Sequence, residues 1–173
     1  MTKVGIYMFR EMRRKKQALP LEESIAILNN GTSGVLAVSG DNDYPYAVPL
    51  SYVYHDFKIF FHCAKTGHKL DAIARNNKAS FCVIDQDNVV PQEYTTYFRS
   101  VIAFGRTRIL DNEDEKRSAF EILAARYSPD HEQGRLQEID KQFKQVCLVE
   151  LAIDHITGKE SIELVKAKHL QNK

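Results

Sequence analysis

The spacing of hydrophobic residues changes several times along the chain, and each change marks a predicted helix or strand. A helical spacing comes first: Pro20 begins a segment with apolar residues at Ile25 and Leu28, and Gly31 ends it. From Gly34 onward the spacing is mostly that of strands. The predicted strands cover residues 35–38, 46–54, 59–63, 79–84, 99–110 and 146–154. The predicted helices cover residues 20–30, 68–77, 113–127 and 132–145.

Several local signals qualify this pattern. Pro49 cannot donate to a strand ladder, so we expect it in an edge strand, in a bulge or at a point where something else lies against the backbone. Gly105 predicts a bend or a close approach of another backbone. Residues 85–88, Asp-Gln-Asp-Asn, have the composition of a turn, and residues 89–98 predict a less regular connection. The charged tail from Glu160 is expected to become irregular.

Together these elements predict an α+β protein, mainly β, built as a small antiparallel barrel of about six strands with inserted helices. The 173 residues contain no repeat and no linker, which suits a single domain. Within the domain 1–173, residues 1–20 are expected to be an arm-like segment and residues 160–173 a charged tail.

Composition and charge exclude several functions. Hydrophobic residues make up 43% of the chain and charged residues 27%, as in soluble globular proteins. A net charge of +1 gives no electrostatic signature of a nucleic-acid partner. No apolar run has the length of a membrane span, so we expect no membrane partner and a cytoplasmic location. The three unclustered cysteines argue against a disulfide framework or a zinc site.

The basic run at residues 13–16, Arg-Arg-Lys-Lys, is the densest local charge. A solvated surface segment is its simplest interpretation, because short charge runs usually face water. Contact with nucleic acid or with a partner subunit is the alternative.

Residues 59–77 carry the strongest functional signal. A buried strand ends near Cys63, a turn with Gly67 follows, and His68 and Lys69 begin the next helix. Backbone N–H groups at a helix N-terminus lack intrahelical partners and attract anions. Cations are disfavoured there, so the crowding of Lys65, His68 and Lys69 predicts an external anion such as phosphate. The alternative is a solvated turn, and the sequence is not a P-loop.

The six histidines form no metal-binding spacing, so no metal site is predicted. His62 lies at a strand end beside the predicted anion site and is the preferred functional histidine; a core histidine is the alternative. Cys63 and His62 are adjacent in a strand and point to opposite faces, which disfavours a Cys-His hydrolase. Aromatic residues between positions 44 and 97 belong to the core or an interface, or stack on a planar ligand.

Four motifs resemble the pyridoxamine 5′-phosphate oxidase-related, FMN-binding split-barrel superfamily, and within it the nitroimidazole-resistance (Nim-type) flavoproteins. They are Tyr-Ala-Val-Pro-Leu-Ser-Tyr (46–52), Phe-His-Cys-Ala-Lys-Thr-Gly-His-Lys-Leu-Asp (61–71), Arg-Ser-Val-Ile-Ala-Phe-Gly-Arg (99–106) and His-Ile-Thr-Gly-Lys (155–159). The resemblance implies a split β-barrel that dimerises, with FMN in the groove between the subunits.

The resemblance also implies roles for individual residues. His68-Lys69 falls where the oxidases bind the FMN phosphate with an Arg-Lys pair; histidine lacks the bidentate grip of arginine, and Lys65 is expected to compensate. Ser100 replaces a flavin-contacting glutamine. The residues expected to complete the cofactor site are Leu50, Ser51, Tyr52, His62, Cys63 and Gly67 around the ring and phosphate, and Ile156 and Thr157 at the dimer groove.

One departure from the oxidases matters. The C-terminal motif that holds pyridoxal phosphate in them, including its arginine, is not recognisable in this sequence, which disfavours pyridoxamine phosphate oxidation. The Nim-type resemblance instead implies reduction of a small planar or nitro-aromatic compound by an FMN-dependent homodimer, with FAD the less favoured cofactor. His62 is the one candidate proton donor. A flavin carrier or sensor without turnover, and a haem-binding split barrel, are the alternatives.

Overall fold

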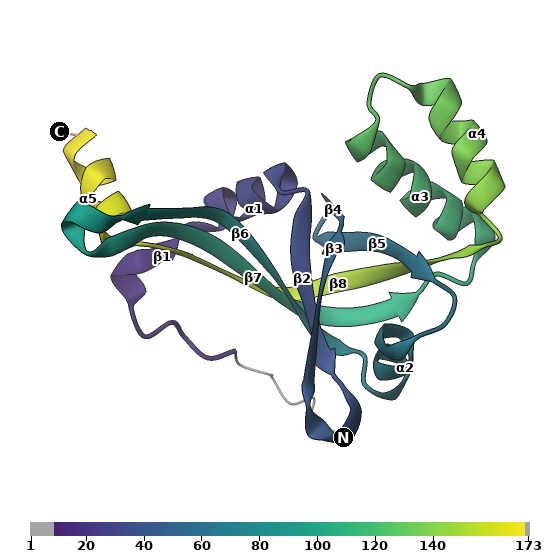
Figure 1. Cartoon of the computed structure of the whole chain (residues 1–173), viewed down its shortest axis with the longest axis horizontal. Helices are drawn as coiled ribbons and strands as arrows, with labels where there is room; N and C mark the ends of the chain where they lie inside the picture. Colours follow the sequence, from purple (N-terminus) through teal and green to yellow (C-terminus); the bar gives the residue numbers. More distant parts are fainter. Residues whose placement is uncertain (1–8, 172–173) are drawn as a thin grey trace, which may run out of the picture.

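One antiparallel sheet of eight strands organises the molecule (Figure 1). The computed structural model describes residues 9–171. The strands are β1 (Ala18–Leu19), β2 (Ser33–Ser39), β3 (Pro45–Ser51), β4 (Val53–His55), β5 (Lys58–Ala64), β6 (Lys78–Val90), β7 (Thr95–Ile109) and β8 (Val146–Glu160). They follow the order β3-β2-β6-β7-β8-β5-β4 across the sheet, and β1 pairs with β8.

The barrel that this sheet forms is split. Its two edge strands, β3 and β4, follow each other in the chain with only Tyr52 between them, and within residues 9–171 no ladder joins them. The predicted fold class, an α+β split barrel made mainly of antiparallel strands, is confirmed. The sheet has more strands than the predicted six because β1 also pairs and because the predicted strand 46–54 is interrupted at Tyr52, which divides it into β3 and β4.

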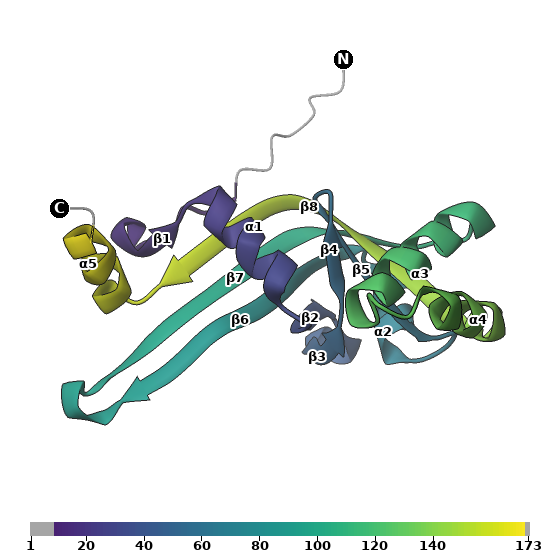
Figure 2. The same cartoon turned by 90° about the horizontal axis from the view of Figure 1, so that it is seen from above.

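Five helices accompany the sheet: α1 (Leu21–Asn30), α2 (His68–Arg75), α3 (Glu113–Tyr127), α4 (Glu132–Gln142) and α5 (Ile162–Gln171), with 3₁₀ turns at Lys15–Gln17, Asp41–Asp43 and Pro91–Glu93. The predicted start of α3 is confirmed, because the Asn112 side chain accepts a hydrogen bond from the Glu115 N–H at 3.0 Å. In Figures 1 and 2, α3 and α4 lie at one end of the sheet, and α5 and the tip of the β6–β7 hairpin lie at the other.

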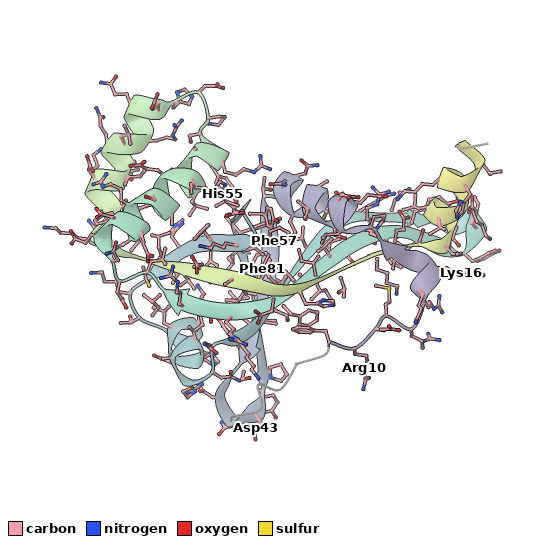
Figure 3. The ribbon with its side chains drawn as sticks, turned by 180° about the vertical axis from the view of Figure 1, so that it is seen from behind. Arg10, Lys16, Asp43, His55, Phe57 and Phe81 are labelled. Atoms are coloured by element: carbon pink, nitrogen blue, oxygen red, sulfur yellow. The ribbon has the colours of Figure 1, made fainter. Side chains whose placement is uncertain are left out.

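One face of the sheet encloses the main core. Leu36, Phe81 and Ala103 lie directly opposite one another on β2, β6 and β7, and all three are fully buried. Figure 3 shows Phe81 near the middle of the sheet. Tyr52 packs its ring on Phe81 at 4.8 Å and donates its hydroxyl to the Leu28 carbonyl of α1 at 2.8 Å. The core therefore joins α1 to the strands that flank the split.

The opposite side of β3, β2, β6, β7 and the second half of β8 is called here the outer face, and no helix of residues 9–171 covers it; α3 and α4 cover the first half of β8, at Leu148. One row of directly paired residues crosses all five strands: Pro49, Val35, Cys82, Ile102 and Thr157. Pro49 is exposed and the other four are half-buried. This row is thus a continuous, largely apolar strip across the outer face, which elsewhere carries polar residues such as Ser80 and Arg106.

Two predictions about special backbone positions are confirmed. Pro49 lies in β3, an edge strand, where its missing N–H costs no central ladder bond. Gly105 lies at a bulge between β7 and β8, and a Cβ there would be only 2.1 Å from the Ala152 carbonyl oxygen. A side chain at Gly105 would therefore separate the two strands.

Three predictions were wrong. Residues 85–88 are not a turn: β6 continues through them to Val90 with an irregular register after Ile84, because β7 pairs with it along the whole length. Residues 89–98 accordingly form the end of a long hairpin, with Pro91–Glu93 as its turn. The tail beyond Glu160 is the helix α5, held to β8 by an ion pair of 2.9 Å between Lys168 and Glu160.

Candidate functional site

The N-terminus of α2 has the strand, turn and helix order that the sequence predicts. Gly67 enters the helix with φ 129°, a conformation that side chains disfavour. The Gly67 carbonyl accepts hydrogen bonds from the N–H groups of Leu70 and Asp71 at 2.9 and 3.2 Å. No side chain caps this helix. Its first N–H groups, those of His68 and Lys69, are therefore free to bind an anion.

Of the three cationic residues near this terminus, only His68 lies near a carboxylate among the described residues. No carboxylate of the described residues forms an ion pair with Lys65 or Lys69. His68 instead turns toward the β2–β3 hairpin, where its Nε2 lies 3.5 Å from the Asp41 carboxylate and its ring 4.1 Å from that of Tyr46. The two lysines keep an unmatched positive charge beside the uncapped helix.

His62 and Cys63 point to opposite sides of β5, as predicted for adjacent strand residues. The His62 ring is exposed and lies 6.1 Å from the Phe120 ring of α3. Partial burial and the nearby Lys69 ammonium lower the pKa of His62. Cys63 is half-buried on the core side, where burial raises the pKa of its thiol despite the opposing effect of Lys69. The Lys69 ammonium therefore acts to lower the pKa of both residues.

The split of the barrel lies close to this terminus. From Phe61 to Ala64, β5 extends beyond its pairing with β4, and β3 pairs only with β2. Leu50 is half-buried and Ser51 is exposed at the end of β3. Tyr52 was expected to line the cofactor site, but its side chain is fully buried in the core. Its sequence position beside Ser51 gave no sign of this, because burial depends on how α1 packs.

The remaining predicted residues lie farther away. Ser100 and Thr157 are on the outer face, on β7 and β8, whereas Ile156 points to the core side. Ser100 lies three strands from β3, about 14 Å at ordinary strand spacing. One chain thus brings together Lys65, Lys69, His62 and Cys63 near α2, but it does not bring Ser100, Ile156 or Thr157 to them.

Sequence reasoning missed a cavity of about 700 Å³ over the outer face. Its lining includes Ser80, Phe104 and Arg106 of the sheet, and Phe9 from the N-terminal segment. The Phe9 ring stacks on His155 at 4.6 Å. The outward alternation of Phe104 and Arg106 was visible in the sequence, but the approach of Phe9 was not. A second cavity of about 540 Å³ includes Lys65 and Cys147 in its lining.

Within residues 9–171, no three His, Cys, Asp or Glu side chains gather as metal ligands would. None of the helices described is both long and apolar enough to cross a bilayer. The basic run at 13–16 is exposed, and Lys15 forms an ion pair with Glu11, four residues earlier, as expected for a solvated segment.

Solved structures with this fold include three informative examples, and none of the curated proteins matches the sequence significantly. A proposed 5-nitroimidazole antibiotic resistance protein from Bacteroides thetaiotaomicron is 19% identical, with 83% of this chain and 86% of that chain covered and a TM-score of 0.69. The flavocytochrome Anf3 from Azotobacter vinelandii is 19% identical, with 88% and 72% covered and a TM-score of 0.75. The FAD and heme binding protein from Mycobacterium smegmatis is 24% identical, with 84% and 73% covered and a TM-score of 0.70.

At these identities the structural similarity establishes the fold, and the sequence itself establishes the family. The sequence profile of the family described as pyridoxamine 5′-phosphate oxidase matches residues 20–160, from the start of α1 to the end of β8. This match covers well over half of the chain, and the protein therefore belongs to the pyridoxamine 5′-phosphate oxidase family.

Proposed function

We propose that this protein is an FMN-dependent oxidoreductase that binds the flavin phosphate at the N-terminus of α2. One observation carries the proposal: Lys65 and Lys69 have no carboxylate partner among the described residues, yet they flank an uncapped helix N-terminus. A phosphate with close to two negative charges would neutralise both ammonium groups. Its oxygens would also accept hydrogen bonds from the free N–H groups of His68 and Lys69. The residues present therefore fit the phosphate end of FMN.

The direction of β3 suggests where the flavin ring would lie. The strand runs from Tyr46, which contacts His68, to Ser51, a span of about 16 Å. A ligand anchored at α2 and lying along the split would bring its ring near Leu50, Ser51 and His62. The bound flavin would supply the redox chemistry, while the protein orients it and limits its contact with water.

His62 is the proposed proton donor of this site. Its lowered pKa keeps the imidazole neutral at neutral pH, so one ring nitrogen carries a hydrogen that can be donated. Its ring lies 6.1 Å from that of Phe120, on the side of β5 that faces away from the main core. In this proposal His62 is a catalytic residue, and Lys65, His68 and Lys69 bind the cofactor.

A homodimer would complete the site. Ser51, Ser100 and Thr157 share the outer face, although they come from three different strands. A second copy packed on this face would cover Val35, Cys82 and Ile102 and would bring its own Ser100 and Thr157 toward the split of the first. This arrangement accounts for predicted site residues that one chain leaves apart.

The proposed substrate is a small nitro-aromatic or other planar compound. The support is the resemblance of residues 61–71 to the Nim-type proteins and the shared fold with the Bacteroides protein. Haem and FAD are alternative ligands, because the Azotobacter and Mycobacterium proteins with this fold are a flavocytochrome and a FAD and heme binding protein.

Absorption spectroscopy of the purified protein after addition of each cofactor tests the proposal. We expect near-ultraviolet and blue flavin bands with FMN, no Soret band with haem, and consumption of a 5-nitroimidazole when a reductant is added. Flavin binding without turnover would favour a carrier or sensor. A Soret band together with no flavin uptake would overturn the proposal.

A further inference from the structure

Two of the three cysteines lie directly opposite each other in the sheet. Cys63 of β5 and Cys147 of β8 are register partners in an antiparallel ladder, one pair before its end at Ala64 and Val146. Both are free thiols, and each influences the pKa of the other; the Cys147 thiol also donates to the Leu148 carbonyl at 3.9 Å. The third, Cys82, lies on the outer face of β6, which is the other side of the sheet. The sequence gave no sign of this pair, since 83 residues separate its members.

The geometry of this pair is close to that of a disulfide. Directly opposite residues of an antiparallel pair have Cβ atoms about 4.5–5.5 Å apart, and a disulfide requires about 3.5–4.5 Å. The bond therefore needs the two strands to approach slightly. That movement is small at this position, because only one further pair follows before β5 leaves the sheet toward Gly67.

The two thiols differ in access and in acidity. Cys63 is half-buried, whereas Cys147 is 8% exposed and borders the 540 Å³ cavity lined by Lys65. Burial raises the pKa of Cys147 to about 11. Burial also raises the pKa of Cys63, but the Lys69 ammonium and the Cys147 thiol oppose that rise. Burial raises both pKa values, so neither thiol is strongly activated, but Cys63 is the more accessible and the more readily ionised of the two and is therefore oxidised first.

We propose that Cys63 and Cys147 form a peroxide-sensitive dithiol that closes to a reversible cross-strand disulfide. The Cys63 sulfur attacks the peroxide, the O–O bond breaks, and a sulfenic acid and one water form. The Cys147 sulfur then displaces the hydroxyl group from Cys63, which gives the disulfide and a second water. Overall the two thiols lose two protons and two electrons, and the peroxide gains them as it becomes two molecules of water.

The bond would be easy to reduce again. Because the strands must approach to form it, the disulfide would be strained and would have a more oxidising potential than a structural disulfide. This matches a chain with few cysteines and no disulfide framework, where a bond of this kind acts as a transient switch. The proposal does not depend on flavin binding.

The test treats the reduced full-length protein with hydrogen peroxide and follows its intact mass and its free thiols. We expect a product lighter by two hydrogen atoms, one free thiol in place of three, a peptide that links Cys63 to Cys147, and full reversal by dithiothreitol. The Cys82→Ser control should react in the same way. Cys147→Ser should accumulate a sulfenic acid at Cys63 that dimedone traps.

Several results would overturn the proposal. These are an unchanged thiol number in the wild-type protein, a disulfide that includes Cys82, or dimers linked through Cys63 between two chains. Phenylarsine oxide, which bridges neighbouring thiols, gives a second readout that needs no variant. Its binding to the wild-type protein should block the mass change produced by peroxide, and failure to bind would also contradict the pairing.

Discussion

Two clusters of positive side chains in this molecule differ in whether the protein itself neutralises them. At the end of β8, the buried Glu160 lies 3.3 Å from Arg99 and 2.9 Å from Lys168. At the N-terminus of α2, Lys65 and Lys69 have no such partner in the part of the chain that the structure describes. The first cluster joins α5 to the sheet, and the second is available to a ligand.

The largest expected effect is a loss of stability when the first cluster, Glu160 with Arg99 and Lys168, loses its carboxylate. Glu160→Gln removes a carboxylate that is 3% exposed, and Arg99 and Lys168 then keep only Asp85 and Glu23 as partners, so the free energy of unfolding should fall by about 2–3 kcal/mol. Urea denaturation measures this loss. FMN affinity, measured under conditions in which the variant is folded, should not change. A parallel loss of affinity would show that the two clusters are not independent.

A substitution in the second cluster, Lys65 and Lys69, should instead weaken ligand binding and leave the stability of the protein nearly unchanged. Lys69→Ala should weaken FMN binding by about 1.5–3 kcal/mol, because a charge-assisted phosphate contact is lost. Fluorescence titration measures the affinity. The stability without ligand should stay nearly constant. Lys166→Ala, which removes an exposed lysine of α5, is the matched control and should bind FMN normally.

The sequence predicted this second region better than the first. The strand before Gly67 and the cations after it are neighbours in the chain, so local pattern was enough to propose a phosphate site. The pairing of Glu160 with Arg99 depends on two strands that are 61 residues apart in sequence. Without that pairing the tail has only scattered apolar positions, and the helix α5 was missed.

Other predictions failed for the same reason, because they depend on contacts between segments that are distant in sequence. The turn-like residues 85–88 form a strand because β7 returns beside them, which no local signal shows. Tyr52 was expected to border the ring, but its side chain is buried by packing between α1 and Phe81. Ser51, Ser100 and Thr157 were proposed from resemblance, and only the sheet register shows that they share the outer face.

The proposed dimer links the outer face to the ligand. Ile102→Asp places a charge in the middle of that face, so the dimer dissociation constant should rise at least about tenfold, and FMN should bind more weakly. Analytical ultracentrifugation with and without FMN measures the linkage. Leu170→Asp, at a residue of α5 that is 75% exposed, is the control. Dimerisation that is indifferent to both FMN and Ile102→Asp would refute this arrangement.

The smallest expected effect is a pH dependence. Partial burial and Lys69 lower the pKa of His62 below 6.5, so at pH values between the two pKa values the unfolded chain holds a proton that the folded chain lacks. Stability should therefore decrease as the pH falls through 6.5 toward the pKa of the folded state. His62→Gln should remove this part of the pH dependence in urea denaturation. In the Lys69→Ala variant, the NMR titration midpoint of His62 should rise.

Comparison of FMN with riboflavin tests the central claim most directly, because the two ligands differ only in the phosphate. The wild-type protein should bind FMN at least about tenfold more tightly than riboflavin, and Lys69→Ala should remove most of this difference by weakening FMN alone. Equal affinity for both ligands in the wild-type protein, or an equal loss for both in the variant, would show that α2 does not bind the phosphate.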